Sequence, residues 1–380
     1  MNRFKALFLA FSLLVSTDAF CFPEMVRHGY VNCTACHVSP SGGGVLSAYG
    51  RELSKELLST WGRDGEQAFA YGLIKPPENV NLGGDYRQAY IYDSTPQVQE
   101  GRPLFMQADI EGAVNFGKWT LDAMVGYQNP TQAMIFSDHL LSRRHYVMYH
   151  LTDELTLRGG RFYENYGINM PDHTVLVRGG LSGSRQGLGI NDEGYETYNL
   201  EGAFIGDKYN VFITGIFGRP DAPQSATQLD REKGVSINSS FALHDTYKVG
   251  ASYLYSQIDT SHRHVMGPYG ILGFTPHFFL LTELDYQIQT PVSGNDSQSG
   301  IANYQRLDYE VVQGLHAYIT QEFGRLNFAD TGTIQKAYGV GAQFFPRPHF
   351  EFNFEWQKQY VPTLTSDYID VAWLILHFYP

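Results

Sequence analysis

From about Val80 to the end of the chain, apolar and polar residues alternate with a period of two, which is the pattern of β-strands. The stretch from Leu104 to Phe116 keeps one face apolar, and the stretch from Phe350 to Trp356 sets aromatic residues against Glu and Asn. Short turns and longer polar loops follow one another between these stretches. The short turns lie near residues 116–118, 152–154, 206–208, 244–246, 275–277, 313–315 and 346–348, and the longer loops near 94–102, 129–138, 168–193, 219–231 and 291–302.

Loop lengths that differ between the two ends of the strands are typical of outer-membrane β-barrels. Aromatic residues make up 14% of the 380 residues and charged residues only 17%, which suits aromatic girdles around an uncharged outer wall. We therefore predict an all-β fold, an antiparallel outer-membrane β-barrel of about 16 strands. The last strand, about 367–379, is expected to close on the first. The competing fold is a soluble β-sandwich, in which one strand face is buried and the other faces water.

The polar face of the strands carries acidic residues that would line the lumen. They either guide cations such as Fe(II) or merely solvate the pore. These residues are Asp109, Glu111, Asp122, Glu283 and Asp285.

The N-terminus has the proportions of a secretory signal peptide. Arg3 and Lys5 precede an apolar run over residues 6–16 that is too short to span a membrane. Cleavage after Ala19 or after Cys21 satisfies the preference for small residues. We place the signal peptide at residues 1–21, which removes Cys21. A lipoprotein signal at Cys21 is disfavoured because Phe20 precedes it.

Cys33-Thr34-Ala35-Cys36-His37 is the pattern for covalent attachment of a c-type haem. The two thiols add to the haem vinyl groups, and His37 is the expected proximal ligand of the iron. The alternative is a disulfide between the two cysteines with an incidental histidine. For the distal ligand the sequence leaves several candidates open: His28 or Met25 just upstream, a lumen residue such as His145 or Met124, or an open coordination site.

Residues 22–77 are predicted to form a small α-helical monohaem cytochrome c domain, and residues 78–380 the barrel. Residues 39–44 (Ser-Pro-Ser-Gly-Gly-Gly) break the chain, and residues 45–61 suggest an amphipathic helix. Pro76-Pro77 marks the boundary with the barrel. Because so short a segment cannot bury a haem alone, we expect it to lean on the barrel lumen.

Arg27, the Cys33–His37 motif, Pro40 and the stretch Leu46-Ser47-Ala48-Tyr49-Gly50-Arg51, followed by a barrel, resemble the fused monohaem cytochrome–porins of bacterial outer membranes. The best-known members of that family are iron oxidases of iron-oxidising bacteria. The resemblance implies that Cys33 and Cys36 hold one haem c, that His37 ligates its iron, and that Tyr49 and Arg51 help to build the pocket. In this chain the Gly42–Gly44 stretch lengthens the spacer after the motif.

Together these features predict an outer-membrane electron conduit. A haem held at or in the lumen would pass electrons between an extracellular partner, such as a metal ion, and a periplasmic cytochrome or other redox protein. Fe(II):cytochrome c oxidoreductase activity is one form of this function. A diffusion porin whose haem domain is a plug or redox sensor is the alternative, and a haem enzyme with an open iron site is a third class. Membrane lipid is an expected partner, whereas the net charge of −12 argues against nucleic acid.

Overall fold

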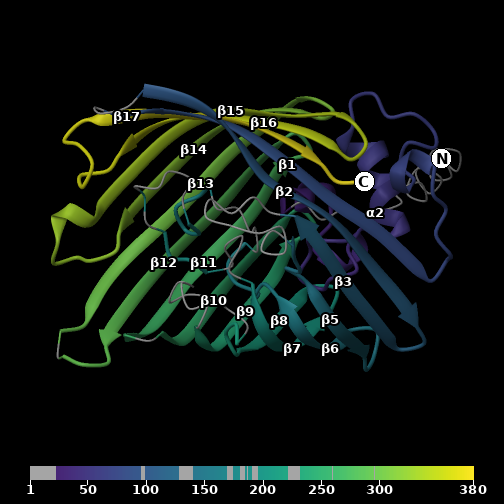
Figure 1. The fold of residues 1–380 in the computed structure, drawn as a ribbon, viewed down its shortest axis with the longest axis horizontal. Helices are drawn as coiled ribbons and strands as arrows, with labels where there is room; N and C mark the ends of the chain where they lie inside the picture. The colour runs from purple at the N-terminus through teal and green to yellow at the C-terminus, as the bar shows by residue number, and fades with distance from the viewer. Residues whose placement is uncertain are drawn as a thin grey trace, which may run out of the picture.

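The computed structural model describes residues 23–95, 99–127, 140–168, 174–179, 185, 187–190, 196–220, 232–258, 260–294 and 296–380. Most of them form one closed antiparallel barrel (Figure 1). Of 17 labelled strands, β4 and β5 both pair with β3 and form one interrupted strand, so the barrel has 16 strands, as expected. The strands are β1 (Val80–Ser94), β2 (Gln99–Phe116), β3 (Trp119–Tyr127), β4 (Leu140–Leu141), β5 (His145–His150), β6 (Leu155–Phe162), β7 (Thr197–Ile205), β8 (Tyr209–Ile216), β9 (Lys233–His244), β10 (Tyr247–Ile258), β11 (Ser261–Thr275), β12 (Phe278–Pro291), β13 (Gln298–Val312), β14 (Leu315–Arg325), β15 (Ile334–Arg347), β16 (Phe350–Tyr360) and β17 (Tyr368–Phe378).

The barrel closes where its last strand meets its first. Strand β17 pairs antiparallel with β1, from Tyr86 opposite Phe378 to Ser94 opposite Asp370. The short turns fall where the sequence predicted them and lie at one end of the barrel, the same end as the N-terminal segment and the C-terminus (Figure 1). We call this end the turn end. Of the predicted longer loops, residues 129–138 lie outside the described residues, and those near 94–102, 168–193, 219–231 and 291–302 are described in part.

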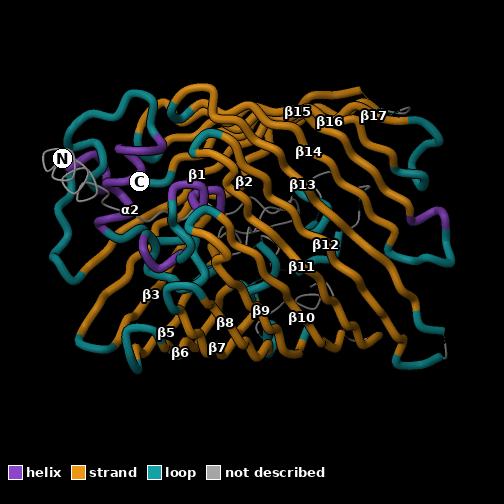
Figure 2. The backbone as a smooth tube through the Cα atoms, turned by 180° about the vertical axis from the view of Figure 1, so that it is seen from behind, coloured by secondary structure: helices purple, strands orange, loops and turns teal. Residues whose placement is uncertain are grey.

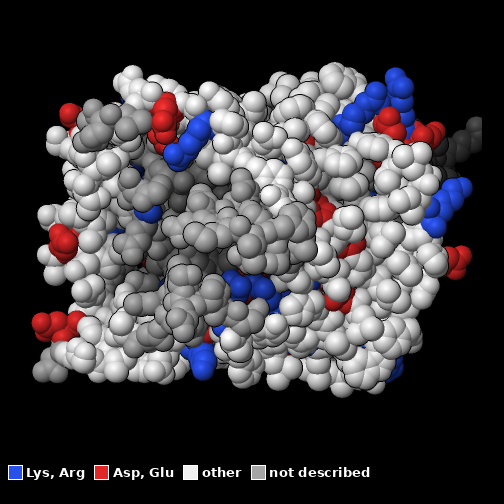
Figure 3. Space-filling view, viewed as in Figure 1, with Lys and Arg blue, Asp and Glu red and all other residues white. Residues whose placement is uncertain are grey.

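The two faces of the wall differ as the alternation predicted. Ile110 and Val125 point outward, with 70% and 64% of their surface exposed, whereas Glu111 and Asp122 point into the lumen and are 3% and 4% exposed. On the face shown in Figure 3, large areas of the outer wall are uncharged, and many of the charged side chains lie toward its two ends. The outer wall is therefore apolar and the inner wall polar.

The N-terminal segment is less helical than the sequence suggested. It contains the short 3-10 turns η1 (Pro23–His28), η2 (Cys33–Ala35) and η4 (Phe69–Gly72), together with one helix. That helix runs from Ala48 as α2 (Ala48–Leu53) and ends with the π-turn η3 (Ser54–Leu58), so the expected helix over 45–61 is wrong at both ends. The described residues contain no helix long and apolar enough to cross a membrane.

The start of the helix is moved by local hydrogen bonds. His37 and Leu46 form an isolated β-bridge, so residues 45 and 46 are extended. The Ser47 hydroxyl then accepts from the Gly50 amide as the N-cap, and the helix begins after it. Figure 2 shows these short elements gathered beside the C-terminus at the turn end of the barrel. The predicted signal peptide, residues 1–21, lies outside the described residues.

Candidate functional site

The Cys33–His37 motif forms one compact turn. The amides of Cys36 and His37 both donate to the Cys33 carbonyl oxygen, at 3.2 and 3.0 Å. Helix α2 packs directly on this turn, because a Cβ atom on Gly50 would come within 2.4 Å of the Cys36 carbonyl oxygen. Only a residue without a side chain fits there, so Gly50 allows the helix to pack directly against the motif.

The residues of the motif fit a covalently bound haem. Cys33 and Cys36 are thiols. A Cβ atom on Gly42, where φ is +81°, would lie 3.4 Å from the Cys33 Sγ atom and 3.9 Å from the His37 Cδ2 atom. A thiol and the imidazole thus face the same side-chain-free position. Two thiols that can bond to the haem vinyl groups and an adjacent imidazole that can ligate the iron are the groups that a c-type haem requires.

An apolar cluster lies beside the motif and contains one of the two upstream ligand candidates. Cys36 packs with Met25, Leu53 and Phe345, the last an inward residue of β15; the remaining buried members are Tyr30 and Leu58. Met25 is fully buried in this cluster. The Nε2 atom of His28 accepts a hydrogen bond from the Arg27 Nε atom at 3.0 Å. The structure therefore places Met25 in the same apolar cluster as Cys36.

Tyr49 and Arg51 have different surroundings. The Tyr49 hydroxyl lies 3.2 Å from the Tyr30 hydroxyl, and Tyr30 belongs to the cluster around Cys36. Arg51 turns to the barrel closure instead: its guanidinium donates to the carbonyl oxygens of Leu82 in β1 and of Pro380, and lies over the Phe69 ring. Burial lowers the pKa of Arg51 to about 10, so it remains charged near neutral pH.

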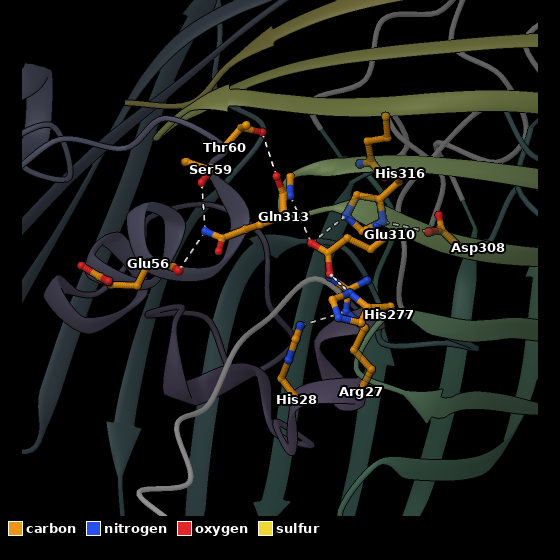
Figure 4. A network of polar contacts seen from close by, with 12 residues as sticks. Arg27, His28, Glu56, Ser59, Thr60, His277, Asp308, Glu310, Gln313 and His316 are labelled. Carbon is orange, nitrogen blue, oxygen red and sulfur yellow. Dashed lines mark hydrogen bonds and ion pairs between the residues drawn. The ribbon is translucent and has the colours of Figure 1, made fainter.

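A buried ion pair holds η1 inside the mouth of the barrel (Figure 4). The Arg27 guanidinium lies 3.2 Å from a Glu310 carboxylate oxygen, and the two side chains are 0% and 4% exposed. Glu310 also accepts from the Gly314 amide at 3.1 Å and lies 3.4 Å from His277 Nδ1. Arg27 contacts β11 closely, since a Cβ atom on Gly273 would come within 2.5 Å of the Arg27 Cα atom.

The loop that follows the motif docks on two arginines of the opposite wall. Arg158 of β6 donates to the hydroxyls of Ser39 and Ser41, at 2.8 and 3.1 Å. The other arginine, Arg144, forms a two-bond ion pair with Glu111 of β2, with both N–O distances 2.8 Å. A Cβ atom on Gly44 would lie 2.9 Å from a Glu111 oxygen, so the backbone of the glycine stretch rests on this ion pair. The stretch that follows the motif, residues 39–44, is thus the loop by which the N-terminal segment docks on the barrel wall.

Between β6 and β7, the described residues 163–168, 174–179, 185 and 187–190 lie in the lumen and reach its opposite wall, and we call them the lumen segment. Seven strands separate β6 from β14 in either direction around the barrel, with β4 and β5 taken as one strand, so β14 stands opposite β6. Glu322 of β14 accepts from the Leu176 amide at 2.6 Å and from Arg185 at 3.1 Å. Arg178 makes two hydrogen bonds to Glu283 of β12, at 2.8 and 3.0 Å.

This lumen segment also joins the N-terminal segment through apolar contacts. One buried cluster contains Val26 of η1, residues of the lumen segment and residues of the wall. From the lumen segment it includes Tyr166, Ile168, Val175, Val177, Leu188 and Ile190. The apolar packing therefore runs without a break from η1 to the segment that crosses the lumen.

The acidic residues predicted for the lumen do line it, and basic or hydroxyl groups partner several of them. Glu111 pairs with Arg144, Glu283 pairs with Arg178, and Asp285 accepts from the Tyr166 hydroxyl at 2.9 Å. Within the described ranges, no group of three or more His, Cys, Asp and Glu residues could hold a metal ion. Glu283 and Asp285 thus hold the lumen segment in place, and Glu111 forms the ion pair on which the glycine stretch rests.

Sequence reasoning missed the arginines that face the lumen. Arg144 and Arg158 lie next to or within stretches expected to form strands, and Arg178 lies in the predicted loop 168–193, so no sequence pattern marked them as lumen residues. The apolar run Val175-Leu176-Val177 within a polar loop was an available signal for the lumen segment, because such a run is unfavourable in water.

Comparisons with known proteins show the fold. No family model matches this chain, and a search of curated proteins finds no match. Solved structures do match. The outer membrane channel DcaP of Acinetobacter baumannii has a TM-score of 0.56 at 11% identity, covering 81% of this chain and 99% of that one. OprB of Pseudomonas putida matches with a TM-score of 0.59 at 10% identity, covering 86% of this chain and 99% of that one. A porin matches with a TM-score of 0.51 at 14% identity, covering 79% of this chain and 100% of that one. The chain therefore has the fold of outer-membrane β-barrel channels.

Proposed function

We propose that this chain is an outer-membrane electron conduit. One haem c, bound through Cys33 and Cys36 and ligated by His37, would lie at the turn end of a barrel that spans the membrane. An extracellular donor or acceptor, with Fe(II) as one candidate donor, and a periplasmic cytochrome or other redox protein would be its partners. The apolar outer wall, the polar lumen and the likeness to outer-membrane channels support the membrane placement.

The position of the motif carries this proposal. The wall clamps the motif-bearing loop from two sides, through Glu310 on Arg27 and through Arg158 on Ser39 and Ser41. A haem held there would be fixed in the mouth of the barrel. Bound haem would supply a group that carries one electron at a time. The lumen segment would keep water and solutes away from it. We propose Met25 as the distal ligand, because it packs in the cluster that contains Cys36.

The division of the chain belongs to the same proposal. Residues 1–21 would be removed as a signal peptide, residues 22–77 would form the haem-binding segment, and residues 78–380 the barrel. The resemblance to the fused cytochrome–porins supports this division, and so does the start of β1 at Val80. In this arrangement the N-terminal segment lies on the periplasmic side, because the short turns of bacterial barrels are periplasmic.

A diffusion porin whose N-terminal segment acts as a plug or redox sensor is the second candidate. The comparisons by themselves favour it, because the matched structures include a porin and an outer-membrane channel. In that case the lumen segment would narrow the passage for solutes, and the two ion pairs that anchor it, Arg178–Glu283 and Arg185–Glu322, would set the size limit.

Reconstitution of the haem-loaded protein in liposomes distinguishes the two functions. The liposomes hold oxidised cytochrome c, and an impermeant reductant is added outside. A conduit reduces the trapped protein without leakage of a small entrapped dye. The matched control is the Cys33→Ser/Cys36→Ser variant, which keeps the barrel and loses the covalent haem. Dye leakage without reduction supports the porin, and equal reduction by the control refutes the conduit.

A further inference from the structure

The segment from Thr60 to Ile74 leaves the mouth and passes over the rim of the barrel. The amides of Thr60 and Trp61 donate to the carbonyl oxygens of Phe345 and Pro346 at the end of β15, at 2.9 and 3.1 Å. Arg347, the last residue of β15, donates to the Trp61 carbonyl oxygen at 2.9 Å. We call residues 60–74 the rim strap.

Two aromatic residues of the rim strap lie on the outer wall. Phe345 faces the lumen, where it packs with Met25, so its neighbour Phe344 faces outward. The Trp61 ring contacts Phe344 edge to face, with centroids 5.6 Å apart. Tyr71 stacks on Phe378 of β17 at 6.1 Å, and its hydroxyl donates to the Pro348 carbonyl oxygen at 3.2 Å.

The strap also exposes large apolar side chains beside these contacts. The exposed fractions are 59% for Trp61, 88% for Leu73 and 51% for Ile74. Full exposure of neighbouring apolar residues to water is unfavourable, and Trp and Tyr prefer the interface between membrane and water. Lys75 follows directly and is exposed, so a cation stands next to the apolar pair.

We infer that the rim strap is immersed in the periplasmic leaflet of the membrane and binds phospholipid. Its rings continue the outward aromatic residues of β15 and β17, so the lipid that covers this wall would also cover Trp61, Leu73 and Ile74. Lys75 would meet the phosphate groups. This inference rests on the proposed membrane placement of the barrel. The strap would hold the N-terminal segment to the membrane as well as to the wall.

Tryptophan quenching in liposomes tests the inference. The full-length, haem-loaded protein is placed in phosphatidylcholine with brominated acyl chains, and each signal is normalised to the same protein in unbrominated lipid. The Trp119→Phe/Trp356→Phe variant reports Trp61, and the Trp61→Phe/Trp356→Phe variant reports Trp119, an outward residue at the same end of the barrel. Trp373 is 2% exposed on the lumen side, and its background is measured with all three others replaced.

We expect the extent of quenching of Trp61 by brominated lipid to be within about twofold of that of Trp119. The Leu73→Ser/Ile74→Ser change should lower the quenching of Trp61 by at least about twofold and leave the quenching of Trp119 unchanged. Quenching of Trp119 alone, with Trp61 open to acrylamide from the water, overturns the inference and leaves the membrane placement intact. Absence of quenching at both positions overturns the membrane placement and, with it, the inference.

Discussion

Replacement of Arg27 by Met tests whether the ion pair with Glu310 fixes the N-terminal segment in the mouth. Both side chains are almost fully buried and lie 3.2 Å apart. Removing one partner of such a pair costs about 3–5 kcal/mol, because the other charge stays buried. Here Glu310 keeps the Gly314 amide and His277, so we expect the lower limit, about 3 kcal/mol. Met fills much of the space over Phe279, which Arg27 now covers at 5.0 Å.

A loss of about 3 kcal/mol raises the equilibrium constant for opening about two orders of magnitude. Hydrogen exchange measures this directly, since amides of residues 23–60 should exchange faster while those of β11 to β14 stay protected. Arg63→Met, an exposed change in the same segment, is the control. Adding Glu310→Gln should restore part of the loss, because it removes the buried charge. Unchanged exchange in residues 23–60, or equal loss of protection in the strands, would refute the reasoning.

Three further predictions follow from single contacts. Gly50→Ala should lower the stability of the N-terminal segment by about 1–3 kcal/mol through overpacking, because its Cβ would meet the Cys36 carbonyl oxygen at 2.4 Å. The yield of covalent haem on a denaturing gel should fall, and a normal yield would contradict this packing. Burial, assisted by the charge of Arg27, lowers the pKa of His28 from 6.5 to about 4. Between these pH values His28 is therefore protonated when the N-terminal segment is released and neutral when it is docked. Docking should therefore weaken as the pH falls from 6.5 to 4, by at most about 3 kcal/mol, and His28→Gln should remove this dependence of hydrogen exchange on pH. Glu322→Gln leaves Arg185 charged in a buried site, so the lumen segment should loosen and single-channel conductance should rise; equal conductance and equal exchange of residues 174–179 would count against its anchoring role.

Much of the barrel could be predicted because its rules are local. Outward Ile110 and inward Glu111 follow from alternation along one strand, and each short turn follows from a break in that alternation. The closure of β17 on β1 follows from the even strand number and the absence of a free edge in a barrel. The helix boundary at Ala48 could not be read in this way, because the His37–Leu46 bridge and the Ser47 cap decided it.

The contacts that position the candidate site join residues far apart in the chain. Arg158 meets Ser39 across 119 residues, and Arg178 meets Glu283 across 105. No periodicity connects such pairs, and each arginine had several carboxylates as equally plausible partners. Likewise, the sequence left both Met25 and His28 open as distal ligands, and only packing showed that Met25 shares an apolar cluster with Cys36.

The sequence by itself determined the wall of this protein, its two faces, its turns and a five-residue motif with the attachment and ligand residues of a c-type haem. These depend on neighbours one to four residues apart, so the amino-acid order contains them. The tertiary structure alone decided that the motif is clamped in the mouth, that a segment crosses the lumen, and that the rim strap lies outside the wall. Closure of the barrel decides these features, because it sets which inward side chains face one another and which residues reach past the rim.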